Sequence, residues 1–194
     1  MPADRLSTSI LEDMKKQDVE WWKQAIYYMS NGVDTKIDYF YLIHYAVITN
    51  RCDIINYLLS ENGMIDVETQ KGRSTAFLLA CMLEKENAMK TLLNSGANIL
   101  TQDKDRDNCL HISLHGSLKI TKILLSEPNN KQYLKDLFYQ KNIYGKTPYE
   151  MSLNKSSAYN LINHYFGFCE EFQDDKCKMS KSECPKLHIL TEGL

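Results

Sequence analysis

The sequence predicts an all-α solenoid of stacked helix pairs, and two repeated signatures are the basis for it. Leu-Leu pairs recur at positions 58/59, 92/93 and 124/125, in steps of 34 and 32 residues. A second signature, upstream of each pair, begins at positions 41, 75 and 108 and again at 147, in steps of 34, 33 and 39. Periods in this range are typical of stacked supersecondary units, none of which buries its apolar face alone. Such arrays usually serve as binding surfaces, so the pattern favours recognition over catalysis.

Each repeat is expected to contain a pair of helices, and the start of the first helix is predicted from residues that favour a helix N-terminus. A threonine such as Thr75 or Thr147 can cap the first backbone N–H groups with its side-chain oxygen. Pro148 suits the next position, because its fixed φ fits the first turn and the N–H it lacks has no partner there. A small residue closes each signature, which lets neighbouring helices approach closely: Ala46, Ala80, Ser113 and Ser152.

The second helix of each unit carries the Leu-Leu pair. We expect Leu58, Leu92 and Leu124 to be fully buried between adjacent repeats. A glycine follows where the helix must end in a left-handed conformation, at Gly63, Gly96 and, in a weaker first unit, Gly32.

The upstream signatures resemble the Thr-Pro-Leu-His-x-Ala motif of ankyrin repeats. They read Tyr41-Leu-Ile-His-Tyr-Ala46, Thr75-Ala-Phe-Leu-Leu-Ala80, Asn108-Cys-Leu-His-Ile-Ser113 and Thr147-Pro-Tyr-Glu-Met-Ser152. The Leu-Leu pairs are similar to the family's Leu-Leu-x-x-Gly-Ala ending. The resemblance covers residues 8–165 and implies four repeats with an N-terminal capping unit. It also implies that His44 and His111 hydrogen-bond to backbone between repeats.

The step of 39 residues places an insertion within residues 127–142. Insertions in solenoids map to loops on one face. Two interpretations stay open: a lengthened hairpin or extra helical turn, and a contact for a partner.

Composition narrows the class of protein. The 194 residues carry a formal net charge of −2, so bulk attraction to nucleic acid or to an anionic membrane is not expected. No apolar run reaches the length of a membrane span, and the first residues lack the apolar core of a signal peptide. We therefore expect a cytoplasmic or nuclear protein with reduced cysteines, of which Cys52, Cys81 and Cys109 act as small apolar residues within the repeats.

The last part of the chain, residues 166–190, resembles a CCCH-type zinc finger. Three thiolates and one imidazole are a standard structural zinc set, and this segment spaces them as Cys-x7-Cys-x6-Cys-x3-His: Cys169, Cys177, Cys184 and His188. The middle interval is one residue longer than usual, and Lys186 replaces an aromatic residue that stacks on a base in RNA-binding fingers. The resemblance implies structural zinc, while free thiols in the tail are the alternative.

The leading functional hypothesis is a non-enzymatic adaptor that binds a protein partner, with the finger as a structural or docking module. Neither a phosphate-binding glycine loop nor a hydrolase or metalloprotease motif occurs, so no small-molecule substrate is expected. A metal site at His111 and His115 would rest on a single pair spaced by four residues. The ankyrin resemblance implies partner contacts at Tyr39, Phe40, Ile48, Met82, Leu83, Arg106, His115 and Lys155. Arg106 belongs to the charged run 103–107, expected to be an exposed hairpin tip.

Two other functions remain open. The first is an RNA-associated factor whose finger contacts RNA while the array tethers it to a larger complex. The second is an ankyrin-type inhibitor of a transcription factor, in which the array alone acts.

Overall fold

The computed structural model describes residues 35–62, 65–69 and 72–165, together with Lys16, Asp18 and Glu20. For residues 35–41 and 61–62 it describes the backbone alone. The predicted N-terminal capping unit before residue 35 lies almost wholly outside these residues, and the predicted zinc module lies wholly outside them. The described part is mostly helical and contains no strand, only an isolated bridge between Glu68 and Thr75. The all-α class is therefore confirmed.

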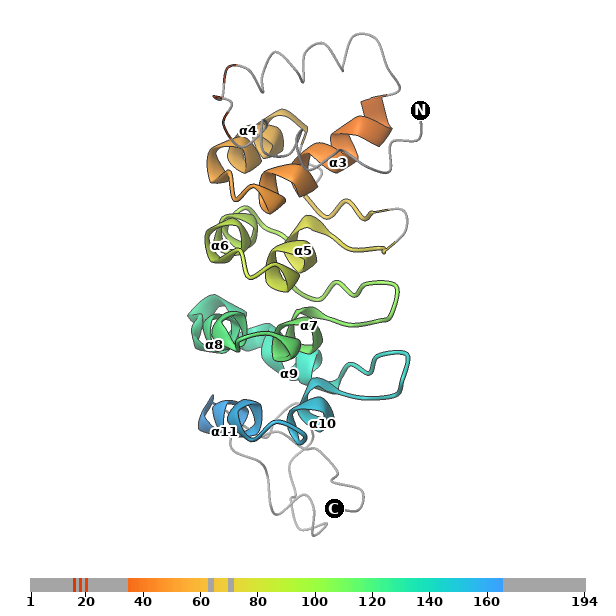
Figure 1. The fold of residues 1–194 in the computed structure, drawn as a ribbon, viewed down its shortest axis with the longest axis vertical. Helices are drawn as coiled ribbons and strands as arrows, with labels where there is room; N and C mark the ends of the chain where they lie inside the picture. Colours follow the sequence, from red (N-terminus) through yellow and green to blue (C-terminus); the bar gives the residue numbers. More distant parts are fainter. Residues whose placement is uncertain are drawn as a thin grey trace. The chain divides into compact units, whose positions relative to one another are not determined.

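The described helices run in the order that a repeat array requires (Figure 1). They are α3 (Thr35–Ile48), α4 (Cys52–Asn62), α5 (Ala76–Met82), α6 (Glu86–Asn94), α7 (Cys109–His115), α8 (Lys119–Ser126), the 3-10 helix η1 (Pro128–Asn130), α9 (Lys131–Tyr139), α10 (Pro148–Ser152) and α11 (Ser156–Tyr165).

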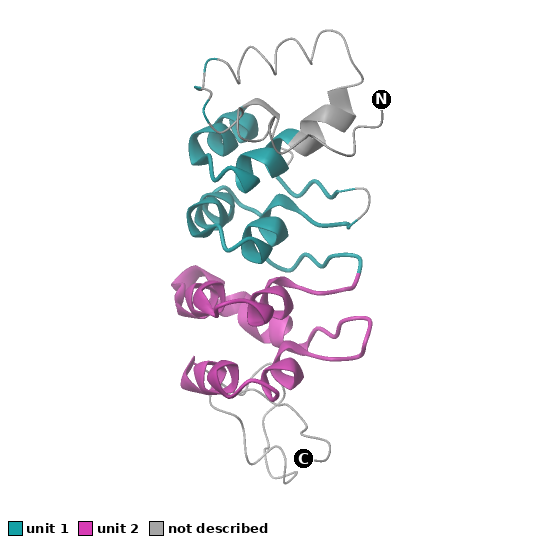
Figure 2. Cartoon of the chain, in the orientation of Figure 1, with its two compact units in different colours: residues 1–104 teal, residues 105–194 magenta. Residues whose placement is uncertain are grey.

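The chain divides into two compact units, residues 1–104 and residues 105–194 (Figure 2). In unit 1, the pair α3–α4 packs against the pair α5–α6, first helix on first helix and second on second. In unit 2, the pair α7–α8 packs in the same way against the pair α10–α11. The described residues of each unit thus form two stacked helix pairs, the repeat that the sequence period predicts.

The first helices begin where the signatures predict. The Thr75 hydroxyl accepts a hydrogen bond from the Leu78 N–H at 3.2 Å. Thr147 forms a capping box, in which its hydroxyl accepts from the Glu150 N–H and the Glu150 carboxylate accepts from the Thr147 N–H at 2.7 Å. These caps satisfy N–H groups that a helix start otherwise leaves unpaired. Pro148 follows as the first helical residue, as predicted.

The second helices form the apolar core of each unit. Leu58, Leu92 and Leu124 are all fully buried, which confirms the prediction. Gly96 follows α6 with φ of +93°, a conformation that costs glycine no side-chain clash. Gly63 and Gly32 lie outside the described residues.

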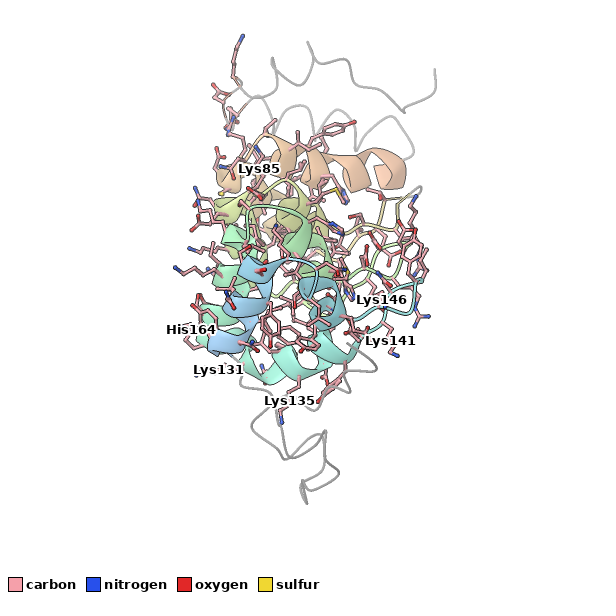
Figure 3. The ribbon with its side chains drawn as sticks, turned by 60° about the horizontal axis from the view of Figure 1, so that its bottom comes forward. Lys85, Lys131, Lys135, Lys141, Lys146 and His164 are labelled. Atoms are coloured by element: carbon pink, nitrogen blue, oxygen red, sulfur yellow. The ribbon has the colours of Figure 1, made fainter. Side chains whose placement is uncertain are left out.

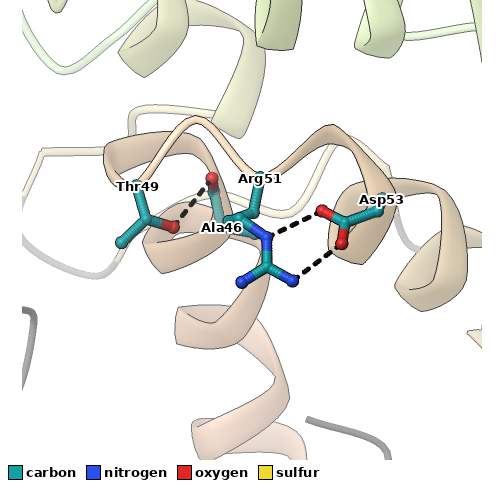
Figure 4. A network of polar contacts seen from close by, with 4 residues as sticks. All are labelled: Ala46, Thr49, Arg51 and Asp53. Atoms are coloured by element: carbon teal, nitrogen blue, oxygen red, sulfur yellow. Dashed lines mark hydrogen bonds and ion pairs between the residues drawn. The ribbon is translucent and has the colours of Figure 1, made fainter. Parts of the chain in front are cut away.

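A bidentate ion pair stabilises the turn between α3 and α4 (Figure 4). The Arg51 guanidinium donates to both carboxylate oxygens of Asp53 at 2.9 and 2.7 Å, and the Thr49 hydroxyl donates to the Ala46 carbonyl. The hydrogen bond from Arg51 lowers the pKa of Asp53. A lowered carboxyl pKa adds stability above the unfolded pKa, and this contribution is lost as the pH falls through the folded value.

Two histidines join neighbouring repeats, as the family resemblance implies. In unit 1 the His44 Nε2 lies 3.1 Å from the Ser74 carbonyl oxygen, and in unit 2 the His111 Nε2 lies 3.0 Å from the Lys146 carbonyl oxygen. A carbonyl oxygen only accepts, so each ring donates from Nε2. The other ring nitrogen of His111 accepts from the Asn108 N–H and completes a capping box.

Replacing His111 by alanine is expected to destabilise unit 2 by about 1–3 kcal/mol, because it leaves buried polar groups unsatisfied. The matched control is His115→Ala, four residues later on the same helix and exposed, for which the expected change stays within about 0.5 kcal/mol. Urea unfolding followed by circular dichroism measures both. Equal midpoints for the two variants would mean that the hydrogen bonds of His111 do not hold the repeats together.

The predicted insertion is a helix of its own. After η1, helix α9 buries Leu134, Leu137 and Phe138 and packs against α7 and α10. The Asn108 side-chain amide donates to the Leu137 carbonyl at 2.8 Å, which ties the end of α9 to the start of α7. The insertion is therefore more than the extra turn or longer hairpin expected, and part of it belongs to the core.

Candidate protein-binding surface

Three of the predicted partner-contact residues lie at the equivalent position of three different repeats. Ile48, Met82 and His115 are the last residues of α3, α5 and α7. Met82 is 51% exposed, His115 is exposed and Ile48 is half-buried. The first helices therefore end in side chains that reach the surface of each unit.

Unit 1 displays an apolar surface at this position, which we call the Met82 surface: Ile48, Met82 and Leu83. Leu83 is 39% exposed, and its backbone N–H is held by the Leu79 carbonyl at 2.9 Å. Because α3 packs against α5, the surface spans two stacked helices. Clustered exposed apolar groups on a rigid support are typical of an interaction site.

Unit 2 places polar residues at the corresponding helix end. The Lys155 ammonium donates to the Gly116 carbonyl at 2.8 Å and to the Leu114 carbonyl at 3.3 Å, next to His115. A cation is favourable at a helix C-terminus, where carbonyl groups carry partial negative charge. Lys155 thus has a structural role at the end of α7, and sequence reasoning had assigned it only to a partner.

The hairpin tips share a backbone conformation. Arg73, Arg106 and Gly145 all have positive φ, at 48°, 58° and 71°. They are spaced by 33 and 39 residues, as the signatures are. Lys104 and Arg106 are exposed, so the predicted exposed tip within residues 103–107 is confirmed.

The structure reveals an apolar tip that sequence reasoning missed, formed by Ile143 and Tyr144 and called here the Tyr144 tip. These side chains are 51% and 75% exposed. The Asn142 side-chain oxygen accepts from the Tyr144 and Lys146 N–H groups, and the Ile143 N–H donates to the Asp105 carbonyl at 2.9 Å. Subtracting the 39-residue step from 143 and 144 gives Lys104 and Asp105 as the equivalent residues one repeat earlier. The change from charged residues to apolar and aromatic ones was therefore visible in the sequence.

Other predicted site residues are only partly described. Tyr39 and Phe40 lie in α3, but their side chains are outside the described residues, as are the whole of Cys169, Cys177, Cys184 and His188. Within the part of the chain that the structure describes, no three histidine, cysteine or acidic side chains gather as a metal site would require. His111 is buried and hydrogen-bonded while His115 is exposed, which leaves the two-histidine metal hypothesis without support.

The repeat cysteines behave mainly as apolar residues. Cys81 and Cys109 are buried as predicted, while Cys52 at the start of α4 is half-buried. Burial raises the pKa of the Cys109 thiol to about 12. A thiol in this state stays protonated near neutral pH and is neither a nucleophile nor a metal ligand.

No helix in the described ranges is both long and apolar enough to cross a membrane.

Comparison with known proteins agrees with the repeat geometry. Residues 43–136 match the family model described as "Ankyrin repeats (3 copies)". A stretch of 78 residues is 35% identical to a protein of Oryza sativa subsp. japonica described as "Probable E3 ubiquitin-protein ligase XBOS31". That stretch covers 40% of this chain and 17% of the rice protein. The pair α10–α11 follows the residues matched by the family model and repeats the same capped arrangement. Residues 43–136 are therefore ankyrin repeats.

Proposed function

We propose that the chain is a non-enzymatic adaptor whose ankyrin repeats bind a protein partner. The observation that carries this proposal is the Met82 surface, where two large apolar side chains stay exposed at the end of a well-packed helix. Burying such groups against a partner is favourable by about 25 cal/mol per Å² of apolar area. Their helix is already ordered, so little conformational entropy is lost on binding.

The Tyr144 tip gives unit 2 a contact of its own. The Tyr144 N–H donates to the Asn142 side chain and the Ile143 N–H donates to the Asp105 carbonyl, while both tip side chains remain outside. Tyrosine on a preorganised loop offers a large apolar face with a polar end, a combination enriched at binding hot spots. Arg106, on the preceding hairpin, supplies a charged neighbour for the rim of such a contact.

Affinity capture from a cell lysate, with and without nuclease, tests the proposed class of function. An adaptor is expected to retain the same protein after nuclease treatment. Loss of every captured protein on nuclease treatment would instead support the RNA-associated alternative. Recovery of background proteins alone in both arms would contradict the adaptor proposal.

Ubiquitin transfer is a second candidate, favoured by the printed name of the rice relative. The match covers 17% of that protein, so we propose that this chain shares the matched stretch and not the ligase activity. An assay with ubiquitin, activating enzyme, a panel of conjugating enzymes and ATP is expected to yield no ubiquitin chains dependent on this protein. Chains that form only when the protein is present would make it a ligase.

We also propose that Cys169, Cys177, Cys184 and His188 hold one structural zinc ion. The support is the four-ligand pattern of the sequence. Elemental analysis of protein purified without chelators is expected to find about one zinc per chain, and Cys177→Ser is expected to lose it. The matched control is Cys52→Ser, which changes a cysteine in the repeats and should retain the metal. Protein without zinc would end this proposal and leave the repeats' function untouched.

A further inference from the structure

The hairpin between α9 and α10, residues 141–146, combines two lysines with the Tyr144 tip. Its sequence is Lys-Asn-Ile-Tyr-Gly-Lys, which contains no acidic residue. Subtracting the 39-residue step gives residues 102–107 as the equivalent hairpin one repeat earlier, and these read Gln-Asp-Lys-Asp-Arg-Asp. The earlier hairpin thus carries three carboxylates and two cations, whereas this hairpin carries two cations and two large apolar side chains.

The backbone of the 141–146 hairpin is fixed by its own hydrogen bonds. The Asn142 N–H donates to the Lys146 carbonyl at 2.9 Å, which joins the two arms of the hairpin. The side-chain oxygen of the buried Asn142 accepts from the Tyr144 and Lys146 N–H groups. Its side-chain nitrogen donates to the Asp107 carboxylate at 2.9 Å. The hairpin is therefore ordered before any ligand binds, with one lysine on each side of the apolar pair.

The side chains of this hairpin that can meet a ligand are open to solvent. Ile143 and Tyr144 are 51% and 75% exposed, and Lys141 and Lys146, which Figure 3 labels beside the hairpin, are exposed as well. Among the residues that the structure describes, no ion pair or hydrogen bond engages either ammonium group. A Cβ atom added at Gly145 would meet no atom within 4 Å beyond its chain neighbours, so the space next to the tyrosine is also open.

We propose that the 141–146 hairpin binds an acidic peptide segment that carries an apolar side chain between its carboxylates. This inference rests on the proposed adaptor function and names the chemistry of one of its contacts. The apolar side chain of the partner covers Ile143 and the ring of Tyr144, while its carboxylates pair with the two ammonium groups. Exposed ion pairs are individually weak, so the apolar contact supplies most of the affinity and the lysines select the charge of the partner. The ordered hairpin loses little conformational entropy on binding.

Nucleic acid fits this hairpin less well than an acidic peptide does. The Ile143 N–H donates to the Asp105 carbonyl at 2.9 Å, so the preceding hairpin, with the Asp105 and Asp107 carboxylates, runs alongside. A phosphate backbone carries one charge for every nucleotide, and a continuous strand would extend past the two lysines towards these carboxylates. Ile143 also offers no ring on which a base can stack. A short peptide places its carboxylates at the two lysines alone.

Selection from a random-peptide phage library against the immobilised full chain tests this contact. The enriched peptides are expected to combine several acidic residues with a leucine, an isoleucine or an aromatic residue. The most enriched sequence is then synthesised with a fluorescent label, and anisotropy gives its dissociation constant. Lys141→Glu with Lys146→Glu should weaken its binding about tenfold or more, because two attractions become repulsions. Ile143→Ser with Tyr144→Ser should weaken it several-fold by removing the apolar contact.

The matched control is Lys122→Glu with Lys131→Glu, which reverses two other exposed lysines of unit 2 and changes the net charge equally. It should leave the dissociation constant within about twofold, and circular dichroism must show that all the variants are folded. Equal weakening by the control and hairpin variants, or enriched peptides without acidic residues, would overturn the inference. So would a labelled single-stranded oligonucleotide that binds the hairpin more tightly than the peptide does.

Two further results separate this inference from the adaptor proposal. Peptide binding that is lost in Met82→Ala with Leu83→Ala, but kept in the hairpin variants, would place the peptide on the Met82 surface. That result overturns recognition by the hairpin and leaves the adaptor proposal standing. A selection that enriches no peptide also overturns the inference, whereas capture of a protein from lysate decides the adaptor proposal independently.

Discussion

Phe138→Ala is expected to destabilise unit 2 by about 3–5 kcal/mol, the range for removing a buried aromatic ring. Phe138 is fully buried on α9, beside Leu134 and Leu137. The helix packs against both α7 and α10, so the cavity would open at the centre of the unit. Denaturant unfolding monitored by circular dichroism gives the free energy of unfolding. Hydrogen exchange locates the loss, which should fall in residues 109–165.

The matched control lies on the same helix. Tyr133 is 37% exposed, so Tyr133→Ala removes another aromatic ring from α9 with an expected cost below about 1 kcal/mol. Similar losses for the two variants would mean that α9 is not packed as the structure shows. If both variants are as stable as the unaltered protein, the inserted helix α9 is a surface helix that the fold does not need.

Leu92→Ala is expected to destabilise unit 1 by about 2–5 kcal/mol. Leu92 is fully buried on α6, which packs against α4 and α5. In a repeat array each unit contacts mainly its neighbours, so the loss should appear first as faster hydrogen exchange in residues 76–94.

Leu93→Ala provides the comparison, because this neighbouring leucine is half-buried and loses less contact on truncation. A larger loss at position 93 than at position 92 would place the wrong face of α6 in the core. Unchanged exchange in residues 76–94 for Leu92→Ala would contradict local unfolding.

Much of the repeat geometry was predictable because it depends on local chemistry. Thr75 and Thr147 cap helices with their own hydroxyl groups, and Leu58 and Leu92 recur with the period of the stacking. The backbone bonds of His44 and His111 followed from the family resemblance, which the match to ankyrin repeats over residues 43–136 supports.

The remaining features depend on tertiary contacts that a period does not encode. An excess of six residues does not reveal that the chain would bury Leu137 and Phe138 in a separate helix. Lys155 is far from Gly116 in sequence, so its bond to the end of α7 had no local signal. Ile143 and Tyr144 were predictable in principle, by aligning the hairpins, but only the exposure of both side chains marks them as a surface.

The most direct test of the adaptor proposal is the dissociation constant of a captured partner, measured by biolayer interferometry against variants of the Met82 surface. Met82→Ala combined with Leu83→Ala should weaken binding at least tenfold, which corresponds to about 1.4 kcal/mol. The control is Lys90→Ala with Glu86→Ala, which removes an exposed ion pair from α6 and should leave the constant unchanged. Thermal melts must show that all the proteins are folded. An unchanged dissociation constant for the folded Met82/Leu83 variant would contradict binding through this surface.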